Sequence, residues 1–388
     1  MAYNFNKVPN RRTVGALNKW TMFPKDVLPM WIADMDFSAP PPILEALRKY
    51  VEHGDLGYRL PSMKLYETIA ERMDKLYGWK ISPDMILSVA GVNSGYNAAA
   101  RTFCTPQRGY LIQTPVYNEF HETRRKASVP QVEAPLAKTV QGNRISYEVD
   151  FDTLARGAKE TSLFLLCNPH NPVGSIYTPA ELKQVARICI ENDVLIVSDE
   201  IHSELLLEGN RFQPIASLSR EIEKRTITLL SASKAFNVPG LFCAFAVIPN
   251  KKLREQYAET VLKMGMHVSS TGLVAAQTAY SGRCDGWLKE LRKYLTDNRD
   301  FLLEYVTKRM PEVRVTAPEA TYLAWLDFTQ FDLKKSPYDF FFKKAKVALS
   351  DGALFGEDGK GHVRLNFGTS RSILKQGLDR MSKTLYSV

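Results

Sequence analysis

The sequence predicts an α/β protein, with a large domain built on a mostly parallel, doubly covered sheet and a smaller α+β domain beside it. Between residues 85 and 248, short apolar and β-branched runs alternate with helical patterns, as in a series of βαβ units. Several of these runs are apolar on both faces, which is typical of strands buried in a parallel sheet. Beyond residue 251, long helical patterns come first and short strands follow, which indicates the second domain.

Residues 1–42 form a predicted N-terminal arm that joins the small domain. The arm is rich in Pro, Trp and Met, and the three prolines at its end can open a helix over 43–53. A loop at 54–61 and a second helix over 64–76 follow. These two helices begin the predicted large domain, which spans residues 43–283.

The large-domain sheet is predicted from six apolar runs separated by turns or helical patterns. These runs are residues 85–90, 110–113, 163–167, 194–198, 226–230 and 243–248. Residues 91–94 form a predicted turn, and helices are predicted over 95–103 and 179–191. Strands that alternate with helices favour parallel pairing, with helices on both faces of the sheet.

The predicted small domain spans residues 284–388. Helical patterns cover residues 252–264, 270–281 and 287–310, and the last is long enough to link two domains. Short strands are predicted at 313–316, 322–327, 347–350 and 363–367, with a helix over 337–346 and a closing helix from Ser372. This succession indicates an α+β unit.

Composition limits the partners that the chain can have. Of the 388 residues 45% are hydrophobic, and the formal net charge is +9. The basic residues occur in scattered pairs and triplets without interleaved aromatics, which indicates a solvated surface and argues against a nucleic-acid partner. The longest apolar run, 241–249, is shorter than the about 20 residues that a membrane helix needs. We therefore expect neither nucleic acid nor membrane as a partner.

Cysteine usage and the N-terminal residues indicate the compartment. The five cysteines are widely spaced and form no Cys-x-x-Cys pair, which favours reduced thiols over a disulfide framework or a zinc site. The first seven residues lack the apolar core of a signal peptide. We expect a cytoplasmic protein without a bound metal.

Polar side chains follow three of the predicted strands at the point where each strand ends. Asn171 follows one strand, Asp199 and His202 follow the next, and Lys234 follows a third. Because open α/β sheets bind ligands beyond the carboxyl ends of their strands, we expect these side chains to share one crevice. Taken singly, Asp199 could cap a helix, Asn171 could shape a turn and Lys234 could be a surface lysine.

Lys234 is the residue with the most specific chemistry. Small residues precede it, so backbone and hydroxyls can close on a ligand, and burial of the lysine stem can lower the pKa of its amine. An amine with a lowered pKa can attack an aldehyde and form a Schiff base. The flanking serines and the turn at Pro239 and Gly240 favour this role.

Three segments of the sequence match the pattern of a known family. They are Asn168-Pro-His-Asn-Pro-Val-Gly174, Ser198-Asp-Glu-Ile-His202 and Ser231-Ala-Ser-Lys-Ala-Phe-Asn-Val-Pro-Gly240. With them the chain resembles, over nearly its whole length, the fold-type I pyridoxal-phosphate enzymes of the class I and II aminotransferase superfamily. The MalY/PatB-type branch of cystathionine β-lyases or cysteine C–S lyases is similar in three further segments: Leu28-Pro-Met-Trp-Ile-Ala-Asp-Met-Asp-Phe37, Gly57-Tyr58 before Pro61, and His362-Val-Arg-Leu-Asn-Phe-Gly368.

The resemblance implies pyridoxal 5'-phosphate as the cofactor and assigns residues to it. Lys234 would hold the cofactor as a Schiff base and then carry protons, and Asp199 would pair with the pyridinium nitrogen. Asn171 would donate to the phenolic oxygen with help from His202, for which a neutral, purely structural role is the alternative. Tyr117 resembles the aromatic residue that stacks on the pyridine ring, with ordinary core packing as its alternative.

The resemblance also implies a phosphate site and a neighbouring subunit. The phosphate would lie on the backbone amides of Val92 and Asn93 at a helix N-terminus, where N–H groups and the helix dipole favour an anion. Ser231 and Ser233 would donate their hydroxyls to it. A tyrosine placed like Tyr58 reaches, in this superfamily, the phosphate of the neighbouring subunit, so we class Tyr58 as catalytic and expect a homodimer with shared active sites.

An amino-acid substrate follows from the same resemblance. Arg364 resembles the arginine that grips the substrate α-carboxylate in a two-pronged contact, facing the crevice from the small domain. Its alternative, a surface ion pair at a strand edge, disagrees with its apolar neighbours Val363 and Leu365. Ala33 in the arm would offer backbone to the same carboxylate, and Asn171 would be a further substrate contact.

Two residues depart from the pattern of the superfamily. Members similar to aspartate aminotransferase carry an arginine shortly after the Schiff-base lysine to hold the phosphate, and this chain has Phe242 there. Asn118 follows Tyr117 where many lyases have a second aromatic residue or proline, which leaves the preference for a thioether open.

The leading functional hypothesis is β-elimination from cystathionine or a related L-cysteine S-conjugate, which gives pyruvate, ammonia and a thiol. The alternative is transamination between an amino acid and a 2-oxo acid, since none of the residues forbids it. A regulatory protein that binds a transcription factor would need a surface patch that the sequence does not show. A nicotinamide dehydrogenase is excluded, because the glycine fingerprint after its first strand is missing.

Overall fold

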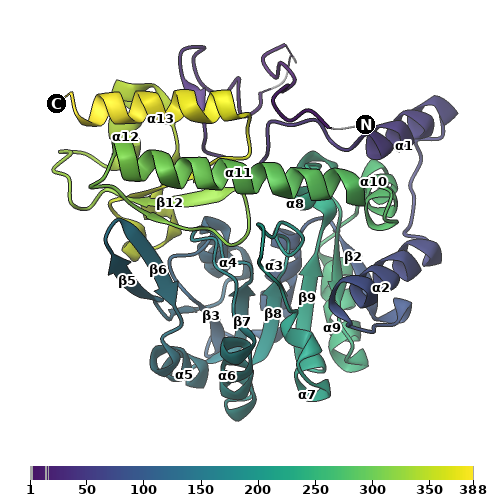
Figure 1. Ribbon diagram of the computed structural model, residues 1–388. Coiled ribbons are helices and arrows are strands. Elements are labelled where there is room, and N and C mark those ends of the chain that lie inside the picture. Colours follow the sequence, from purple (N-terminus) through teal and green to yellow (C-terminus); the bar gives the residue numbers. More distant parts are fainter. Residues whose placement is uncertain (1–2, 14, 16, 388) are drawn as a thin grey trace.

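The computed structural model describes residues 3–13, 15 and 17–387, and it contains two large sheets with helices around them (Figure 1). Four residues of the predicted arm, at 1, 2, 14 and 16, lie outside the described residues. The larger sheet has seven strands in the order β2-β10-β9-β8-β7-β3-β4. Their bounds are β2 Ile86–Val89, β3 Gly109–Ile112, β4 Gln131–Glu133, β7 Thr161–Cys167, β8 Leu195–Asp199, β9 Thr226–Leu230 and β10 Ala244–Val247. Strand β10 runs in the direction opposite to that of the other six strands, which are parallel to one another, so the predicted mostly parallel sheet is confirmed.

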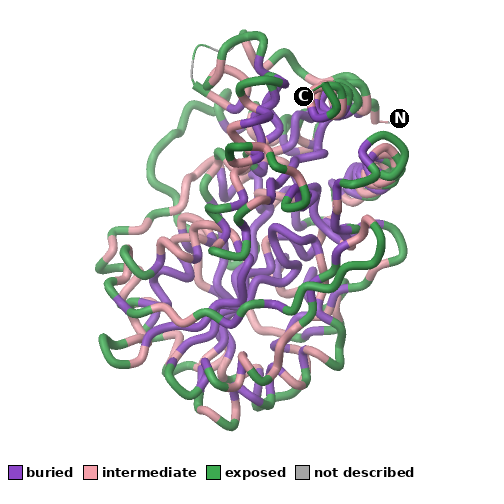
Figure 2. The backbone as a smooth tube through the Cα atoms, turned by 90° about the vertical axis from the view of Figure 1, so that its left-hand side faces the viewer, coloured by how far each residue is buried: buried purple, intermediate pink, exposed green. Residues whose placement is uncertain are grey.

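The centre of this sheet is buried because helices cover both of its faces. One face packs against α3 (Val92–Phe103), α4 (Asn118–Ala127) and α9 (Lys251–Lys263). The opposite face packs against α5 (Phe151–Lys159) and α6 (Pro179–Glu191). Figure 2 shows the buried backbone gathered along the sheet, with exposed turns and helices around it. This double cover explains why the central strands are apolar on both faces.

The six-stranded sheet combines two distant parts of the chain. Its order is β14-β15-β12-β11-β6-β5. The bounds are β5 Ala137–Gln141, β6 Arg144–Glu148, β11 Arg314–Thr316, β12 Leu323–Asp327, β14 Ser350–Asp351 and β15 His362–Asn366. The hairpin β5–β6 comes from the range predicted for the large domain, yet β6 pairs in parallel with β11. The domain limits 1–42, 43–283 and 284–388 stay a prediction.

The N-terminal arm lies against the C-terminal part of the chain. Strand β1 (Leu28–Pro29) pairs in parallel with β13 (Val347–Ala348). Met30, Met35 and Phe37 belong to the same hydrophobic core as residues of α11 and α13. The remaining helices are α1 Pro41–His53, α2 Met63–Tyr77, α7 Arg220–Glu223, α8 Ala232–Ala235, α10 Ser270–Tyr280, α11 Asp285–Arg309, α12 Pro337–Phe340 and α13 Arg371–Leu385. Helix α11 runs from the side of α10 to the six-stranded sheet (Figure 1).

Three local predictions were wrong in detail. The predicted turn at 91–94 is the first turn of α3, because Gly91 takes the N-cap position in extended backbone and the helix begins at Val92. The predicted helix at 337–346 is the single turn α12 followed by a π-helical turn, Phe341–Ala345. The predicted strand at 347–350 is two short strands, β13 and β14, in different sheets.

Within the described ranges, no helix combines the length and apolarity needed to cross a membrane. All five cysteines are free thiols.

Candidate active site

A cavity of about 370 Å³ lies at the carboxyl ends of β7, β8 and β9. It is lined by residues from the arm, from the start of α3, and from the segments that follow β7, β8 and β9. Nine of the predicted site residues line it: Ala33, Val92, Asn93, Tyr117, Asn171, Asp199, His202, Ser233 and Lys234. The expected convergence at one edge of a parallel sheet therefore holds for most of the predicted set.

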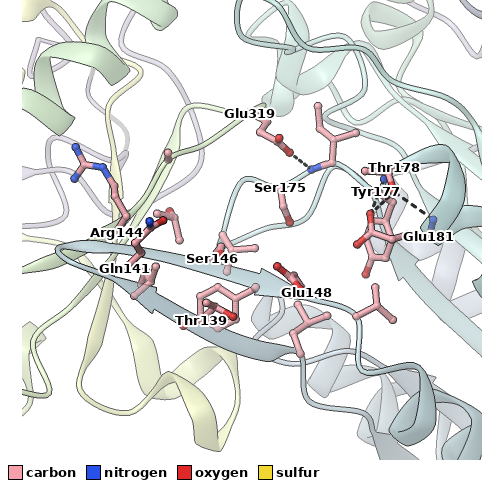
Figure 3. Close-up of a pocket in the computed structure, with 18 residues that line it drawn as sticks. Thr139, Gln141, Arg144, Ser146, Glu148, Ser175, Tyr177, Thr178, Glu181 and Glu319 are labelled. Carbon is pink, nitrogen blue, oxygen red and sulfur yellow. Dashed lines mark hydrogen bonds between the residues drawn. The ribbon is translucent and has the colours of Figure 1, made fainter.

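A second, more open cavity of about 490 Å³ lies elsewhere in the molecule. Figure 3 shows it between the hairpin β5–β6 and the segment at 173–178. Its polar lining includes Glu319, whose carboxylate accepts a hydrogen bond from the Ile176 N–H at 2.8 Å (Figure 3). It contains none of the predicted site residues, so the smaller cavity is the candidate active site.

Lys234 lies in α8, the one-turn helix that follows the buried strand β9. Its Nζ donates to the carbonyl oxygen of Ala33 at 2.6 Å. Burial lowers the pKa of Lys234 to about 8, and the nearby charges of Asp34, Arg364 and Asp199 act on it with mixed sign. An amine with this pKa is partly neutral near neutral pH, so it can act as a nucleophile or a base.

Asp199 is the last residue of β8 and is buried. One of its carboxylate oxygens accepts from the Ile201 N–H at 3.1 Å. Burial raises the pKa of Asp199 to about 6, although the Ile201 N–H and the Lys234 charge oppose the rise. A buried carboxylate in this position stabilises a cation in the cavity.

Arg364 lies beside the cavity in β15 without lining it, and only 4% of the residue is exposed. Its guanidinium donates to Asn171 Oδ1 at 3.0 Å, to the Trp31 carbonyl at 3.0 Å and to Ser350 Oγ at 3.1 Å. It forms no ion pair with any residue that the structure describes, so the alternative of a surface ion pair is wrong. A buried guanidinium without a carboxylate partner favours an anionic ligand.

The Arg364 contact also fixes the amide of Asn171. Because Oδ1 of Asn171 accepts from Arg364, the NH₂ group of the same amide is left to serve as the donor. Asn171 lines the cavity, so this donor is available to a ligand there. The geometry agrees with the predicted donation to a phenolic oxygen.

His202 is buried in the cavity wall with its ring edge-on to Tyr322. Burial, together with the charges of Lys234 and Arg364, lowers the pKa of His202 to about 3, so the ring is neutral at neutral pH. Within the described residues, its Nδ1 has no hydrogen-bond partner. A neutral ring with a free nitrogen can still donate to or accept from a ligand.

Three predicted residues lie outside the cavity lining. Ser231 is the N-cap of α8, and its hydroxyl donates to the Cys243 carbonyl at 2.7 Å and contacts Ser233 Oγ at 2.7 Å. Arg364 lies behind Asn171, and Tyr58 is fully exposed in the loop before α2. Ser231 thus supports the turn that carries Lys234, and Ser233 is the serine that faces the cavity.

Sequence reasoning missed Tyr322 near the candidate site. The residue is fully buried, and its hydroxyl donates to the Ala33 carbonyl at 2.9 Å. In the sequence Tyr322 begins a predicted strand, and nothing in the strand pattern distinguishes it from a core tyrosine. Cys167 and Cys243 also line the cavity.

These residues fit the cofactor that the sequence resemblance implies. Pyridoxal phosphate has an aldehyde for the Lys234 amine, a ring nitrogen for Asp199 and a phenolic oxygen for the Asn171 donor. Its phosphate fits the N-terminus of α3, where Val92 and Asn93 line the cavity and backbone N–H groups lack helical acceptors. Nδ1 of His202 and Nε of Arg364 are buried without a hydrogen-bond partner among the described residues, which favours a polar ligand beside them.

Comparison with known proteins identifies the family of the chain. The model of the family "Aminotransferase class I and II" matches residues 25–381. The "Cystathionine beta-lyase PatB" of Bacillus subtilis (strain 168) is 35% identical over 364 residues, with 93% of each chain covered. The crystal structure of a pyridoxal-phosphate-bound C–S lyase from Staphylococcus hominis has a TM-score of 0.91 at 30% identity, covering 100% of this chain and 99% of that one. A PLP-bound putative aminotransferase from Clostridium difficile 630 has a TM-score of 0.93 at 33% identity, covering 99% and 100%.

Proposed function

The chain belongs to the aminotransferase class I and II family, and from this premise we propose the reaction that it catalyses. It is a pyridoxal-phosphate-dependent carbon–sulfur β-lyase, which releases pyruvate, ammonia and a thiol from cystathionine or a related L-cysteine S-conjugate. The observation that carries this proposal is one cavity that joins a lysine of lowered pKa, a buried aspartate and, behind Asn171, an unpaired arginine.

The substrate is held by residues of two sheets. Arg364 binds the α-carboxylate, and its hydrogen bond to Asn171 Oδ1 keeps the amide donor of Asn171 turned toward the ligand. Ala33 offers the backbone of the arm at the same place. A buried site that fixes the carboxylate in this way positions the α carbon for proton transfer.

Lys234 moves the proton. When bound, pyridoxal phosphate supplies an electron sink for the electron pair that remains on the α carbon after its proton leaves. Nζ of Lys234 accepts that proton, the electron pair forms the bond between the α and β carbons, and the carbon–sulfur bond breaks with its pair on sulfur. The Lys234 ammonium then has a proton to give to the thiolate, and water completes the release of pyruvate and ammonia. Asp199 would pair with the ring nitrogen and, as an anion, would favour a proton on it.

Backbone amides and a hydroxyl would hold the phosphate. The amides of Val92 and Asn93 and the hydroxyl of Ser233 form the polar part of that end of the cavity. Phe242 also lines the cavity, at the place where members similar to aspartate aminotransferase carry an arginine. Tyr117, the N-cap of α4, also lines the cavity and would stack on the pyridine ring.

A homodimer with shared sites completes this account. Tyr58 does not line the cavity of its own chain, and it lies in an exposed apolar strip with Leu56, Leu60 and Met63. Such a strip is typical of a surface that another chain covers. Tyr58 of the partner subunit then reaches the phosphate. The five free cysteines support the predicted reducing, cytoplasmic compartment.

Transamination remains the second candidate, because a structural neighbour is described as a putative aminotransferase and the same residues would serve it. The two reactions share the removal of the α-proton by Lys234. They differ in whether the sulfur leaves or the amino group passes to a 2-oxo acid.

The deciding experiment measures pyruvate release from L-cystathionine with no 2-oxo acid present. We expect steady release over many turnovers by the protein loaded with pyridoxal phosphate, and none by Lys234→Ala. Lys252→Ala, an exposed lysine of α9, is the matched control and keeps full activity. A product that forms only when 2-oxoglutarate is added would replace the lyase by the aminotransferase.

A further inference from the structure

The carbonyl oxygen of Ala33 accepts hydrogen bonds from two buried side chains. Lys234 Nζ lies 2.6 Å from it, and the hydroxyl of Tyr322 lies 2.9 Å from it. Tyr322 is fully buried and directly precedes β12, while Lys234 follows β9. The arm, the lysine turn and the six-stranded sheet therefore meet at one oxygen atom.

The backbone around this oxygen is held on both sides. Nδ2 of Asn366 donates to the Ile32 carbonyl at 2.7 Å and to the Asp34 carbonyl at 2.6 Å. Asn237 exchanges two hydrogen bonds with Met35, each of 3.0 Å. These bonds hold the peptides on either side of Ala33, while the Tyr322 hydroxyl holds the Ala33 carbonyl oxygen itself, so its position does not depend on the lysine.

The two donors divide the acceptor capacity of this oxygen. A carbonyl oxygen has two lone pairs, and the Tyr322 O–H and one Lys234 N–H occupy them. Burial raises the pKa of Tyr322 well above its usual value, so its hydroxyl stays protonated and remains a donor. A Lys234 amine that donates one N–H to a fixed acceptor cannot rotate freely, so its own lone pair is directed away from Ala33.

We propose that Tyr322 is a positioning residue for proton transfer, because it fixes the Ala33 carbonyl that holds the Lys234 amine while the amine carries the substrate α-proton. The inference rests on the proposed function, in which Lys234 removes that proton. The hydroxyl of Tyr322 acts through Ala33 and Lys234, whereas its ring packs edge-on to His202 and is kept in Tyr322→Phe. The donation from Nζ to Ala33 is possible both in the neutral amine and in the ammonium, so the amine keeps one place through the proton transfer.

The charged groups around the Lys234 amine shift its protonation in opposite directions. Asp34 from the arm and Asp199 from β8 favour the ammonium, and Arg364 from β15 disfavours it, while His202 is neutral. The Tyr322 hydroxyl competes with Lys234 for the same carbonyl. Its removal leaves the whole acceptor to the ammonium and so favours the protonated lysine.

The test uses Tyr322→Phe, which removes only the hydroxyl. L-Alanine has no β leaving group, so the exchange of its α-proton with D₂O, followed by NMR, reports proton transfer by the pyridoxal-phosphate-loaded protein without elimination. The exchange rate is divided by the concentration of bound cofactor, measured by its visible absorption, so unfolded protein does not contribute. We expect the exchange at saturation to fall roughly tenfold, with the KM for alanine within about twofold of the unaltered protein. We also expect the acid limb of the pH profile to move to higher pH.

Two further variants make the result specific. Tyr110→Phe is the matched control, because Tyr110 is fully buried and donates to the Phe120 carbonyl at 2.8 Å outside the cavity. It should exchange like the unaltered protein. Tyr322→His keeps a donor on an aromatic ring and should recover part of the rate.

Each other outcome overturns the proposal. Equal exchange by Tyr322→Phe and Tyr110→Phe removes the positioning role alone. Loss of the visible cofactor band in Tyr322→Phe would make the residue a support of the fold or of cofactor binding instead. No exchange by the unaltered, cofactor-loaded protein would overturn the proposed function and this inference together.

Discussion

Three buried ionisable side chains determine the chemistry of the cavity, and burial shifts the pKa of each of them. Burial lowers the pKa of Lys234 and raises that of Asp199, so both stand near the pH at which a cell works. Arg364 keeps its charge, because its pKa is lowered by burial only to about 10. Its charge is met by the Trp31 carbonyl and the Asn171 amide oxygen, which leaves room for an anion.

Removal of the Arg364 side chain should weaken substrate binding far more than cofactor binding. We expect Arg364→Ala to raise the KM for cystathionine about 100-fold, because a buried, hydrogen-bonded partner of the carboxylate is lost. The visible absorption of bound pyridoxal phosphate should be unchanged. Arg108→Ala is the control, since Arg108 binds the Thr161 and Asn192 carbonyls at the other end of the sheet. If Arg364→Ala weakened substrate binding and cofactor binding equally, Arg364 would not be the specific partner of the substrate carboxylate.

Most of the cavity could be predicted from the sequence, because parallel strands bring their carboxyl ends to one edge. Lys234, Asp199 and Asn171 each follow a recognisable buried strand. The orientation of side chains could not be predicted in the same way. Ser231 and Ser233 look equivalent in the sequence, yet the first caps α8 and the second lines the cavity. The contact of Tyr322 could not be predicted, because its hydrogen bond to Ala33 depends on the packing of the arm and joins residues 289 positions apart.

At the scale of elements, side chains of the hairpin β5–β6 bind the strands β12 and β15 of the same six-stranded sheet. Lys138 of β5 forms an ion pair of 2.7 Å with Asp327 at the end of β12, and its Nζ also lies 3.0 Å from Nε2 of His362. The ring of His362 stacks on Trp325, and its Nδ1 lies 2.9 Å from the Lys360 carbonyl. Burial lowers the pKa of His362, which favours the neutral ring. Nε2 of the neutral ring carries a lone pair that accepts a hydrogen bond from Lys138.

The Asp327 carboxylate should stabilise the fold in a way that depends on pH. Burial raises its pKa, but hydrogen bonds from Lys138 and Thr329 outweigh this and bring the pKa from 3.8 to about 2. A depressed pKa gives stability that is present above pH 3.8 and is lost as the pH falls toward 2. Urea unfolding should show Asp327→Asn less stable by about 2 kcal/mol at neutral pH.

The difference between Asp327→Asn and the unaltered protein should shrink as the pH falls through the same window. Asp332→Asn serves as the control, because Asp332 is 75% exposed and should change little. A gap of constant size between pH 5 and pH 2 would show that the carboxylate charge contributes nothing.

The elements that sequence reasoning missed share a physical reason. Strand β5 is exposed along its whole length at the edge of a sheet, so it shows no apolar pattern. Helix α4 buries only Phe120 and Thr123 and is otherwise rich in charge. Helix α6 and strand β9, by contrast, were predicted with the bounds that the structure has, because a capping box or a fully apolar run marks them.

At the scale of the whole molecule, we expect a dimer whose two chains share their active sites. The exposed strip around Tyr58 lies in the loop between α1 and α2, away from the lining of its own cavity. A two-fold dimer places the same strip of each chain against the other. The phosphate end of the cavity then gains a tyrosine that a single chain does not bring to it.

Mixing two inactive variants tests this sharing. Lys234→Ala lacks the amine, and Tyr58→Ala lacks the hydroxyl supplied across the interface. After unfolding and refolding together, a mixed dimer has one site with both residues intact. We expect the mixture to recover up to about a quarter of the unaltered lyase activity. Recovery no greater than the sum of the two variants alone would place Tyr58 outside the site.

The most direct test of the central claim is the covalent bond between the cofactor and Lys234. The protein is incubated with pyridoxal phosphate, freed of excess by gel filtration, and examined by visible absorption. It is then reduced with borohydride and digested, so that the labelled lysine can be found by mass spectrometry. We predict a visible band that Lys234→Ala lacks, and a label on Lys234. A band of equal strength in Lys234→Ala, or a label on another lysine, would contradict the account.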